Sequence, residues 1–275
     1  MKKLYFVLIV ILFADVAVGQ IINIPDPNFK AKLLQPNVAY DVSEMPVIID
    51  SNGNGEIEVS EAQLIYGLNV SNSNISDLTG ISNFSALENL NCSYNLLTSI
   101  TIDSAISLIS FHASHNALTF IDVNIATDGY VSLSHNNLTS YAFESGNSYD
   151  TVDLSHNQIS NLIFYNNDFG YLSVNHNNLS SMQITGGASA FYFADFSNNE
   201  FSLLNLIYFT FDNEATLNLG NNVIDKVQFG SSKPGNIGYT SNNTFLDLGN
   251  FNRITSCDPE NQGNLYISDC PNLVY

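Results

Sequence analysis

An asparagine that returns every 20 to 23 residues constrains the fold of this chain more than any other feature of its sequence. Apolar residues stand five and three positions before it and two after it, as with Leu172, Val174 and Leu179 around Asn177. The copies are Asn95, Asn116, Asn136, Asn157, Asn177, Asn199, Asn222 and Asn242, with Ser73 as a diverged first copy. This period predicts a solenoid, because one short repeat cannot bury its apolar face without stacked neighbours.

The alternation of apolar and polar residues before each asparagine predicts a short strand with one buried face. The asparagine stands where the chain must leave the strand, and its amide is suited to bind the backbone groups that a sharp turn frees. Stacking the nine copies in register predicts a parallel sheet on the order of 40 Å long, at about 4.8 Å per strand.

The pattern resembles the leucine-rich repeat, L-x-x-L-x-L-x-x-N-x-L, over residues 68–248. This resemblance implies a leucine-rich repeat solenoid with short parallel β-strands on a concave face. Asp128 and Glu214 replace the first apolar residue of their repeats, and Thr244 and Asp247 interrupt the last one. We therefore expect the stack to fray or change at these places. A parallel β-helix is the alternative fold, but its coils lack this fixed asparagine.

Residues 1–19 have the pattern of a signal peptide. A positive start at Lys2 and Lys3 precedes the apolar run from Leu4 to Phe13, and Ala17-Val18-Gly19 provides a small-x-small cleavage site. The alternative is a membrane anchor, but the run is short for a bilayer and no later segment reaches 18 apolar residues. We expect a secreted or cell-surface protein without a transmembrane segment.

The repeats are expected to be closed by caps at both ends, an N-terminal cap of residues 20–67 and a C-terminal cap of residues 249–275. Cys257 and Cys270 are near enough in sequence to close a small loop in the C-terminal cap. Cys92 occupies an apolar repeat position, so we expect a free, buried and inert thiol there.

The charge of the chain excludes two classes of partner. It has 26 acidic and 7 basic residues, a formal net charge of -19. Nucleic acids and anionic membrane surfaces both require clustered lysine and arginine. We therefore expect neither as a partner.

The segment from Asp50 to Glu61 matches the calcium-loop pattern D-x-[DN]-x-[DN]-G-x5-E at every position. A calcium ion requires six or seven oxygen ligands, which alternate residues and one backbone carbonyl supply in such loops. The expected ligands are Asp50, Asn52, Asn54, Glu56 through its carbonyl, and Glu61. The loop resembles an EF-hand or dockerin-type loop, and its expected role is to order the N-terminal cap. A solvated Asn/Gly turn without metal is the alternative.

The N-terminal cap begins with a short helix, in which Asp26 is the N-cap and Pro27 the first residue. Phe29 and Leu33 lie one helical turn apart. The leader, this segment, the calcium-like loop and the repeats together resemble secreted, internalin-like leucine-rich repeat proteins of Bacteroidetes.

Four of the five histidines occupy one repeat position, immediately before the signature asparagine. They are His115, His135, His156 and His176. Stacked strands bring successive rings within about 5 Å of each other, which allows a metal-binding or pH-sensing column. The alternative is a copied Ser-His-Asn phrase that tolerates histidine at a solvated turn.

Two further columns point outward from the predicted sheet. Tyr130, Tyr171 and Phe193 stand six positions before the asparagine, and His112, Asp153 and Asp195 stand four before it. Exposed aromatic rings beside short polar and acidic groups are typical of a protein recognition surface. The same rings are also suited to stacking on sugars, or merely to stabilising neighbouring strands.

No nucleophile elbow, phosphate-binding glycine loop or zinc-protease motif is present in the sequence. We expect an exported, non-enzymatic binding module that engages a protein partner through the concave repeat face. The alternatives are a glycan-binding adhesin or accessory protein of polysaccharide use, and a structural cell-surface component.

Overall fold

The computed structural model describes residues 19–103, 106–185, 189–206, 208–222, 226–229, 236–239 and 264–267. The leader up to residue 18 and all but four residues of the expected C-terminal cap lie outside these residues. Asn242, Thr244, Asp247, Cys257 and Cys270 also lie outside them.

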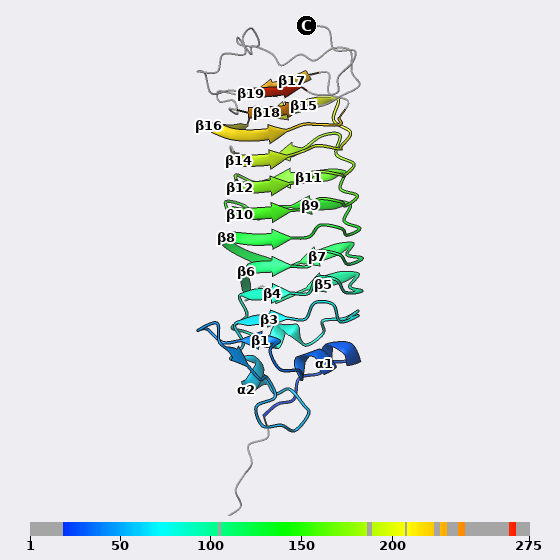
Figure 1. Cartoon of the computed structure of the whole chain (residues 1–275), viewed down its shortest axis with the longest axis vertical. Helices are drawn as coiled ribbons and strands as arrows, with labels where there is room; N and C mark the ends of the chain where they lie inside the picture. Colours follow the sequence, from blue (N-terminus) through cyan, green and yellow to red (C-terminus); the bar gives the residue numbers. More distant parts are fainter. Residues whose placement is uncertain are drawn as a thin grey trace, which may run out of the picture.

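The chain winds into stacked coils, and each repeat adds one strand to a twelve-stranded main sheet. Strands β3 to β19 of this sheet pair parallel with their neighbours, as predicted from the alternation before each asparagine (Figure 1). The strands are β3 (Gly67–Asn69), β4 (Asn89–Asn91), β6 (Ser107–His112), β8 (Asn124–Ser132), β10 (Ser148–Asp153), β12 (Asp168–Ser173), β14 (Ser189–Asp195), β16 (Phe209–Asn218), β18 (Asn236–Tyr239) and β19 (Asn264–Ile267). The predicted solenoid of short parallel β-strands is confirmed.

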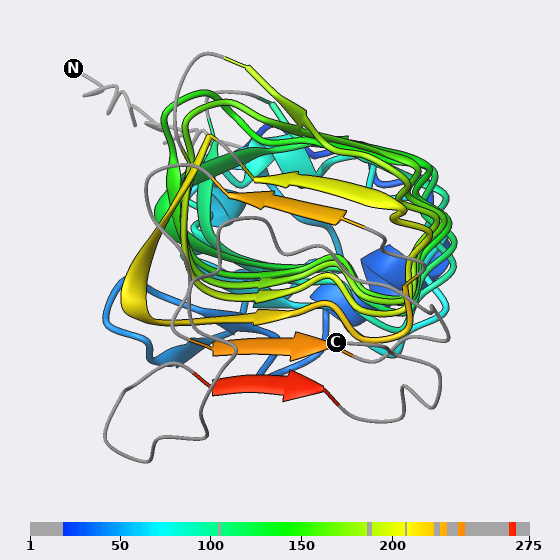
Figure 2. The ribbon, with the colours of Figure 1, turned by 90° about the horizontal axis from the view of Figure 1, so that it is seen from above.

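A second wall of shorter parallel strands faces the main sheet across the core (Figure 2). Its strands are β5 (Ser99–Thr101), β7 (Phe120–Asp122), β9 (Ser140–Ala142), β11 (Asn161–Phe164), β13 (Gln183–Ile184), β15 (Leu203–Leu206) and β17 (Lys226–Phe229). Because parallel pairing spaces both walls similarly, the coils rise as a nearly straight column in Figure 1. We call the outward side of the main sheet the open face.

The signature asparagines form a ladder of hydrogen bonds that joins consecutive coils. Asn157 shows the pattern: its amide nitrogen donates to the carbonyl oxygens of Leu133 and Leu154, both at 3.0 Å, and its carbonyl oxygen accepts from the backbone N–H of Leu138 at 3.0 Å. Leu133 and Leu138 belong to the preceding coil. The ladder thus satisfies buried backbone groups of two coils at once, in the role predicted from the sequence.

The apolar repeat positions fill the space between the walls. The positions before and after the asparagines are buried, including Leu90, Leu97, Phe111, Leu118, Val131, Leu133, Leu138, Val152, Leu154, Ile159, Leu172, Val174, Leu179, Phe196, Phe201, Leu217 and Leu219. Phenylalanine dominates the later coils, where the ring of Phe164 lies 5.2 Å from Phe143 and 5.3 Å from Phe209, between ring centroids. Cys92 is buried and unpaired, and burial raises the pKa of its thiol to about 12, as expected for an inert side chain.

The N-terminal residues close one end of the column. Helix α1 (Pro27–Leu33) is capped by Asp26, one carboxylate oxygen of which accepts from the backbone N–H groups of Asn28 and Phe29. The other oxygen accepts from the backbone N–H and hydroxyl of Ser76, so Asp26 joins the helix to the first coil. Burial acts to raise the pKa of Asp26, but these hydrogen bonds outweigh it and hold the pKa below its usual value.

The rest of this region covers the sheet edge. Strand β1 (Ala39–Tyr40) pairs antiparallel with β3 and with β2 (Pro46–Val47), which prevents further parallel addition at this end. A short helix α2 (Val59–Ala62) begins within the last residues of the calcium-like loop, and a 3-10 turn spans Ile81–Asn83. Within the described residues, no helix has the length and apolar character needed to cross a bilayer.

At Asp128 and Glu214, where the stack was expected to fray or change, both strands continue and the pairing changes register. Asp128 takes a left-handed backbone conformation, with φ 60°, inside the nine-residue strand β8. Register shifts absorb the extra residues: 126–129 of β8 lie opposite Ile109, and 212–215 of β16 lie opposite Tyr192. A β-bulge places an out-of-pattern residue outside the ladder without ending the pairing.

Candidate partner-binding face

The two outward columns predicted from the sequence lie in register across the open face, with one residue from each strand, and we call them rows. Ser110, Tyr130, Thr151, Tyr171 and Phe193 are paired in register from β6 to β14. A second row, two residues further along each strand, consists of His112, Ser132, Asp153, Ser173 and Asp195. The main-sheet ladder therefore fixes the spacing of these side chains.

The aromatic residues of the first row form two separate ring pairs. Tyr171 and Phe193 stack with centroids 4.7 Å apart and planes within 2°. Tyr130 stacks instead on His112, also at 4.7 Å. The shorter side chain of Thr151 stands between the pairs, and the strands of Tyr130 and Tyr171 lie about 10 Å apart. Tyr130 and Tyr171 are 36% and 38% exposed, which leaves their outer edges accessible.

The acidic residues of the second row are held by the turns that follow their strands. One carboxylate oxygen of Asp153 accepts from the backbone N–H of Ser155, and one of Asp195 accepts from the backbone N–H of Ser197. The other oxygen of Asp195 accepts from the side-chain amide of Asn175 at 3.2 Å. These aspartates thus have a structural use, which the sequence analysis did not assign to them.

The predicted histidine column exists as a continuous stack at the edge of the open face. Successive ring centroids of His115, His135, His156 and His176 are 4.2 Å apart, with planes 7° to 15° from parallel. Tyr94 extends the stack by one ring, again at 4.2 Å. Every member has a positive φ between 54° and 57°. Tyr94 was missed in the sequence analysis, although it stands immediately before a signature asparagine like the histidines.

The stack does not have the geometry of a metal site. Nearly parallel rings direct their nitrogen lone pairs side by side, whereas a zinc ion requires ligands that converge on one point. In the part of the chain that the structure describes, no three histidine, cysteine or acidic side chains converge on a possible metal position. Burial is the main cause that lowers the pKa of His115 and His156, and neighbouring imidazoles lower both further, while Asp153 opposes the shift at His156.

We predict that the histidine column makes stability depend on pH below about 6.5, the usual histidine pKa. Since the folded pKa values of His115 and His156 are depressed, the unfolded chain takes up protons first as the pH falls. The contribution is therefore complete above the unfolded pKa and is lost as the pH falls through the folded values. Thermal melts between about pH 7 and pH 5 measure this loss.

The matched variant replaces all four column histidines with asparagine. Asn198 and Asn221 occupy the same repeat position with φ 55° and 54°, so asparagine fits this backbone. The variant should show a smaller fall in Tm on acidification than the unmodified chain, since other carboxylates titrate in both. Superimposable pH profiles would rule out the contribution of the column.

The calcium-like loop is folded tightly around its own side-chain oxygens. The Asp50 carboxylate accepts from the backbone N–H groups of Asn54 and Gly55, at 3.1 and 2.9 Å. The side-chain carbonyl of Asn52 accepts from Asn54 N–H, and that of Asn54 from Glu56 N–H. The side chain of Glu56 pairs with Lys30 of α1 at 2.6 Å.

Two buried carboxylates complete the loop. Glu61 accepts from the hydroxyl and N–H of Ser51 and from the N–H of Glu58. Glu58, which was not among the predicted ligands, accepts from the side-chain amides of Asn52 and Asn54 at 3.2 and 2.7 Å. Burial acts to raise the pKa of Glu61, but its hydrogen bonds with Glu58 and Ser51 outweigh this effect and keep the pKa low.

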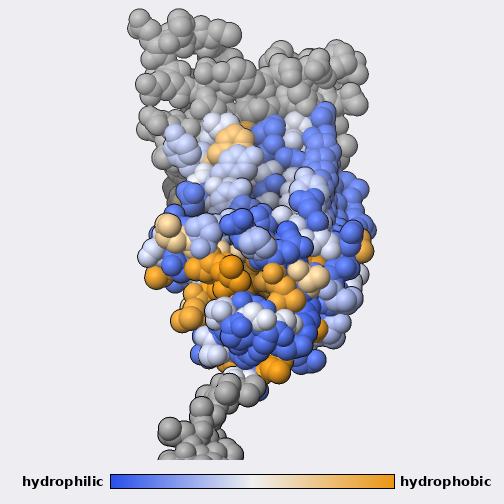
Figure 3. Space-filling view, turned by 60° about the horizontal axis from the view of Figure 1, so that its bottom comes forward, coloured by the Kyte–Doolittle hydropathy of each residue, from blue (hydrophilic) through white to orange (hydrophobic). Residues whose placement is uncertain are grey.

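The N-terminal cap also exposes large apolar side chains, which the sequence analysis did not single out. Val42, Met45, Ile48 and Leu64 are each more than 60% exposed. Figure 3 shows apolar surface gathered over this end of the column, whereas the coils above it are mostly hydrophilic.

Comparisons with known proteins connect the chain to two solved structures. No family model and no curated protein matches it. The functional domain of InlJ from Listeria monocytogenes, described as including a cysteine ladder, is 17% identical over 91% of this chain and 77% of that chain, with a TM-score of 0.33. The internalin InlF from Listeria monocytogenes is 13% identical over 94% and 95%, also with a TM-score of 0.33. At these values, the fold assignment rests on the strand register and asparagine ladder of this chain.

Proposed function

We propose that this protein is an exported, non-enzymatic binding module that holds a protein partner on the open face of its main sheet. The observation that carries the proposal is the pair of in-register rows, with two rigid ring pairs beside short polar and acidic groups. Such surfaces contribute contact area at little cost in side-chain entropy, because their rings are held in place before binding.

Stacking within the rows favours a protein partner over a glycan. A sugar ring packs on an open aromatic face, but Tyr171 is covered on one face by Phe193 and Tyr130 by His112. Their exposed edges, on the two sides of the shorter Thr151 side chain, are suited instead to side chains that insert between the ring pairs. A glycan-binding adhesin is the second candidate, with Tyr130, Tyr171 and Phe193 as its stacking platforms.

The test is the double substitution Tyr130→Ala with Tyr171→Ala. Binding of the purified protein to cell surfaces should weaken at least tenfold, since truncation of central aromatic residues in interfaces typically costs about 2 kcal/mol or more. The matched control is Phe120→Ala, a 56% exposed ring on the opposite wall, which should change binding less than twofold. Equal affinity of the double variant and the unmodified protein would disprove the assignment of the open face, and would leave a structural cell-surface role.

Export is part of the same proposal and rests on the sequence. The positive start, the apolar run and the small-x-small site within residues 1–19 direct a chain to secretion. We infer a secreted or cell-surface location, where an acidic module meets partners from outside the cell.

We also propose that the loop from Asp50 to Glu61 binds a structural calcium ion. The side-chain oxygens of Asp50, Asn52 and Asn54 lie along one tight turn, and Glu61 is fixed at its end by Ser51. Carboxylate and amide oxygens at this spacing match the hard, oxygen-rich coordination that calcium prefers. The bound ion would order the N-terminal cap, because the Ile57 carbonyl of the loop accepts from the N–H of Ile22 in the same cap.

Calcium is expected to raise the melting temperature of the unmodified protein, and Asp50→Ala is expected to abolish that rise. Thermal unfolding with excess calcium and with excess chelator measures the effect. Asp122→Ala, which removes an exposed carboxylate from β7, should keep the full calcium response. A melting temperature of the unmodified protein that is equal in calcium and in chelator would refute the site.

A further inference from the structure

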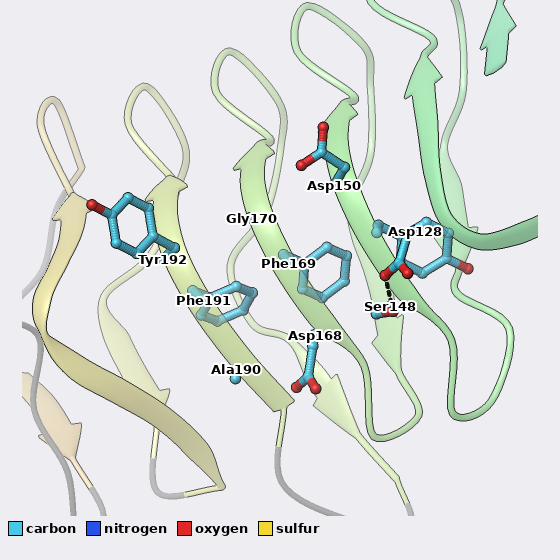
Figure 4. Close-up of a pocket in the computed structure, with 10 residues that line it drawn as sticks. Asp128, Ser148, Asp150, Asp168, Phe169, Gly170, Ala190, Phe191 and Tyr192 are labelled. Carbon is cyan, nitrogen blue, oxygen red and sulfur yellow. Dashed lines mark hydrogen bonds between the residues drawn. The ribbon is translucent and has the colours of Figure 1, made fainter. Parts of the chain in front are cut away.

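A hollow of about 770 Å³ lies on the open face at the beginning of the strands β10, β12 and β14 (Figure 4). Asp128, Asp150 and Asp168 line it, Tyr192 stands at one side, and Phe169 and Phe191 lie beneath. None of these residues belongs to the two rows described above. The hollow is therefore a separate feature of the same face.

Two strand bulges produce the hollow. At one end, residues 126–129 of β8 lie opposite the single residue Ile109, and at the other end residues 212–215 of β16 lie opposite Tyr192. Between these two ends, β10 pairs with β12 and β12 with β14 in continuous register, without extra residues. The bulged strands β8 and β16 thus border the hollow, and β10, β12 and β14 form its floor.

The floor is rigid and closely approached by the backbone. Gly170 lies there, and a Cβ at this position would come within 2.6 Å of the Asp150 carbonyl oxygen, so no larger residue fits without a shift. Beneath it, the rings of Tyr149, Phe169 and Phe191 stack in sequence, with centroids 5.5 and 5.4 Å apart. Packing of these buried rings fixes the positions of the carboxylates above them.

The charge around the hollow has one sign. Asp128, Asp150 and Asp168 are exposed, and Asp128 accepts a hydrogen bond from the Ser148 hydroxyl. The sequence contains no lysine or arginine between residues 33 and 225, whereas residues 68–225 contain 14 aspartates and glutamates. Consequently no lysine or arginine from residues 33–225 is available to neutralise the hollow, and its field attracts a cation from a partner.

We propose that this hollow receives a lysine or arginine side chain from a basic segment of the protein partner. The aspartates accept hydrogen bonds from the guanidinium or ammonium group, and the ring of Tyr192, which is 54% exposed, offers a face for a cation–π contact. The inference rests on the proposed function and makes it specific, because it names a basic partner surface and a second anchoring point beside the two rows.

The probe is a fluorescent hexaarginine peptide, with a hexaglutamate peptide as the reference. Anisotropy titrations at physiological salt compare the unmodified protein with Asp150→Asn/Asp168→Asn, which removes two charges and preserves side-chain shape. The control variant, Asp122→Asn/Glu200→Gln, removes two exposed charges outside the hollow. Thermal melts verify that all variants are folded.

The affinities of the unmodified protein and the control variant for hexaarginine are expected to agree within twofold. Both proteins are expected to bind the peptide at least tenfold more tightly than the Asp150→Asn/Asp168→Asn variant does. Tyr192→Ala is expected to weaken it about threefold. Equal losses in the two double variants would indicate diffuse charge attraction and overturn the proposal, as would no binding by the unmodified protein. A hollow that bound neutral oligosaccharides and not hexaarginine would also overturn it.

The outcome is separable from that of the proposed function. The peptide titration compares charge variants inside and outside the hollow, whereas the Tyr130→Ala/Tyr171→Ala experiment reports on the rows. Loss of peptide binding in Asp150→Asn/Asp168→Asn, together with unchanged cell-surface binding of the tyrosine variant, would support the hollow and reject the rows.

Discussion

Replacing Asn157 with alanine is expected to destabilise the solenoid by about 3 to 5 kcal/mol, because each buried polar group left unsatisfied costs about 1–3 kcal/mol. The substitution removes the partners of the Leu133 and Leu154 carbonyls and of the Leu138 N–H. Asn157 is buried, so water does not readily replace the lost amide. Equilibrium unfolding in urea measures the change.

The matched control is Asn137→Ala, in the preceding coil. Asn137 is exposed, and its side chain makes only a long contact, 3.4 Å, with Gln158. A change below about 0.5 kcal/mol is expected for this variant, as for other surface substitutions. Similar destabilisation by Asn137→Ala and Asn157→Ala would mean that the ladder does not hold the coils together.

Phe164→Ala is the second substitution with a large expected effect, again about 3–5 kcal/mol, the usual cost of a buried phenylalanine. The Phe164 side chain is fully buried between the two walls, with the rings of Phe143, Phe169, Phe191 and Phe209 around it. Alanine leaves a cavity that neighbouring rings cannot fill without leaving their own rotamers. The loss should appear as a lower midpoint of urea unfolding with a similar slope.

Phe120→Ala provides the comparison, because that ring lies on the same wall but is 56% exposed. It should lower the free energy of unfolding by less than about 0.5 kcal/mol. A Phe164→Ala variant as stable as Phe120→Ala would show that the aromatic core does not bear on stability.

The repeating elements of the fold were predictable because a strict period records a packing requirement at every turn of the coil. Asn136 and Asn177 both donate to two carbonyls and accept from one N–H at equivalent repeat positions, so the requirement recurs in the sequence. The histidine column followed from the same alignment, since equal repeat positions are neighbours across stacked coils.

The features that break the period could not be predicted in this way. At Asp128 the stack was expected to fray or change, because a sequence pattern does not distinguish a strand that ends from one that bulges. The hollow depends on two such bulges and on Gly170, which are not related by the repeat. The second wall was also missed, because its strands are short and vary in length from coil to coil.

The roles of individual polar residues were only partly predictable. Asp153 and Asp195 were expected to be free for a partner, but each caps the turn after its strand through one oxygen. In the calcium-like loop, Glu58 was not predicted because its position is variable in the loop pattern, yet it accepts from both asparagine amides. Such contacts depend on local backbone geometry, which residue spacing does not specify.

The most direct test of the binding function is a comparison of cell surfaces before and after protease treatment. The purified protein, displayed multivalently in calcium buffer, is applied to both surfaces and to a panel of polysaccharides. A protein partner predicts saturable binding that is lost after protease treatment, without a polysaccharide signal. Saturable polysaccharide binding that survives the treatment would contradict a protein partner and favour the glycan-binding adhesin.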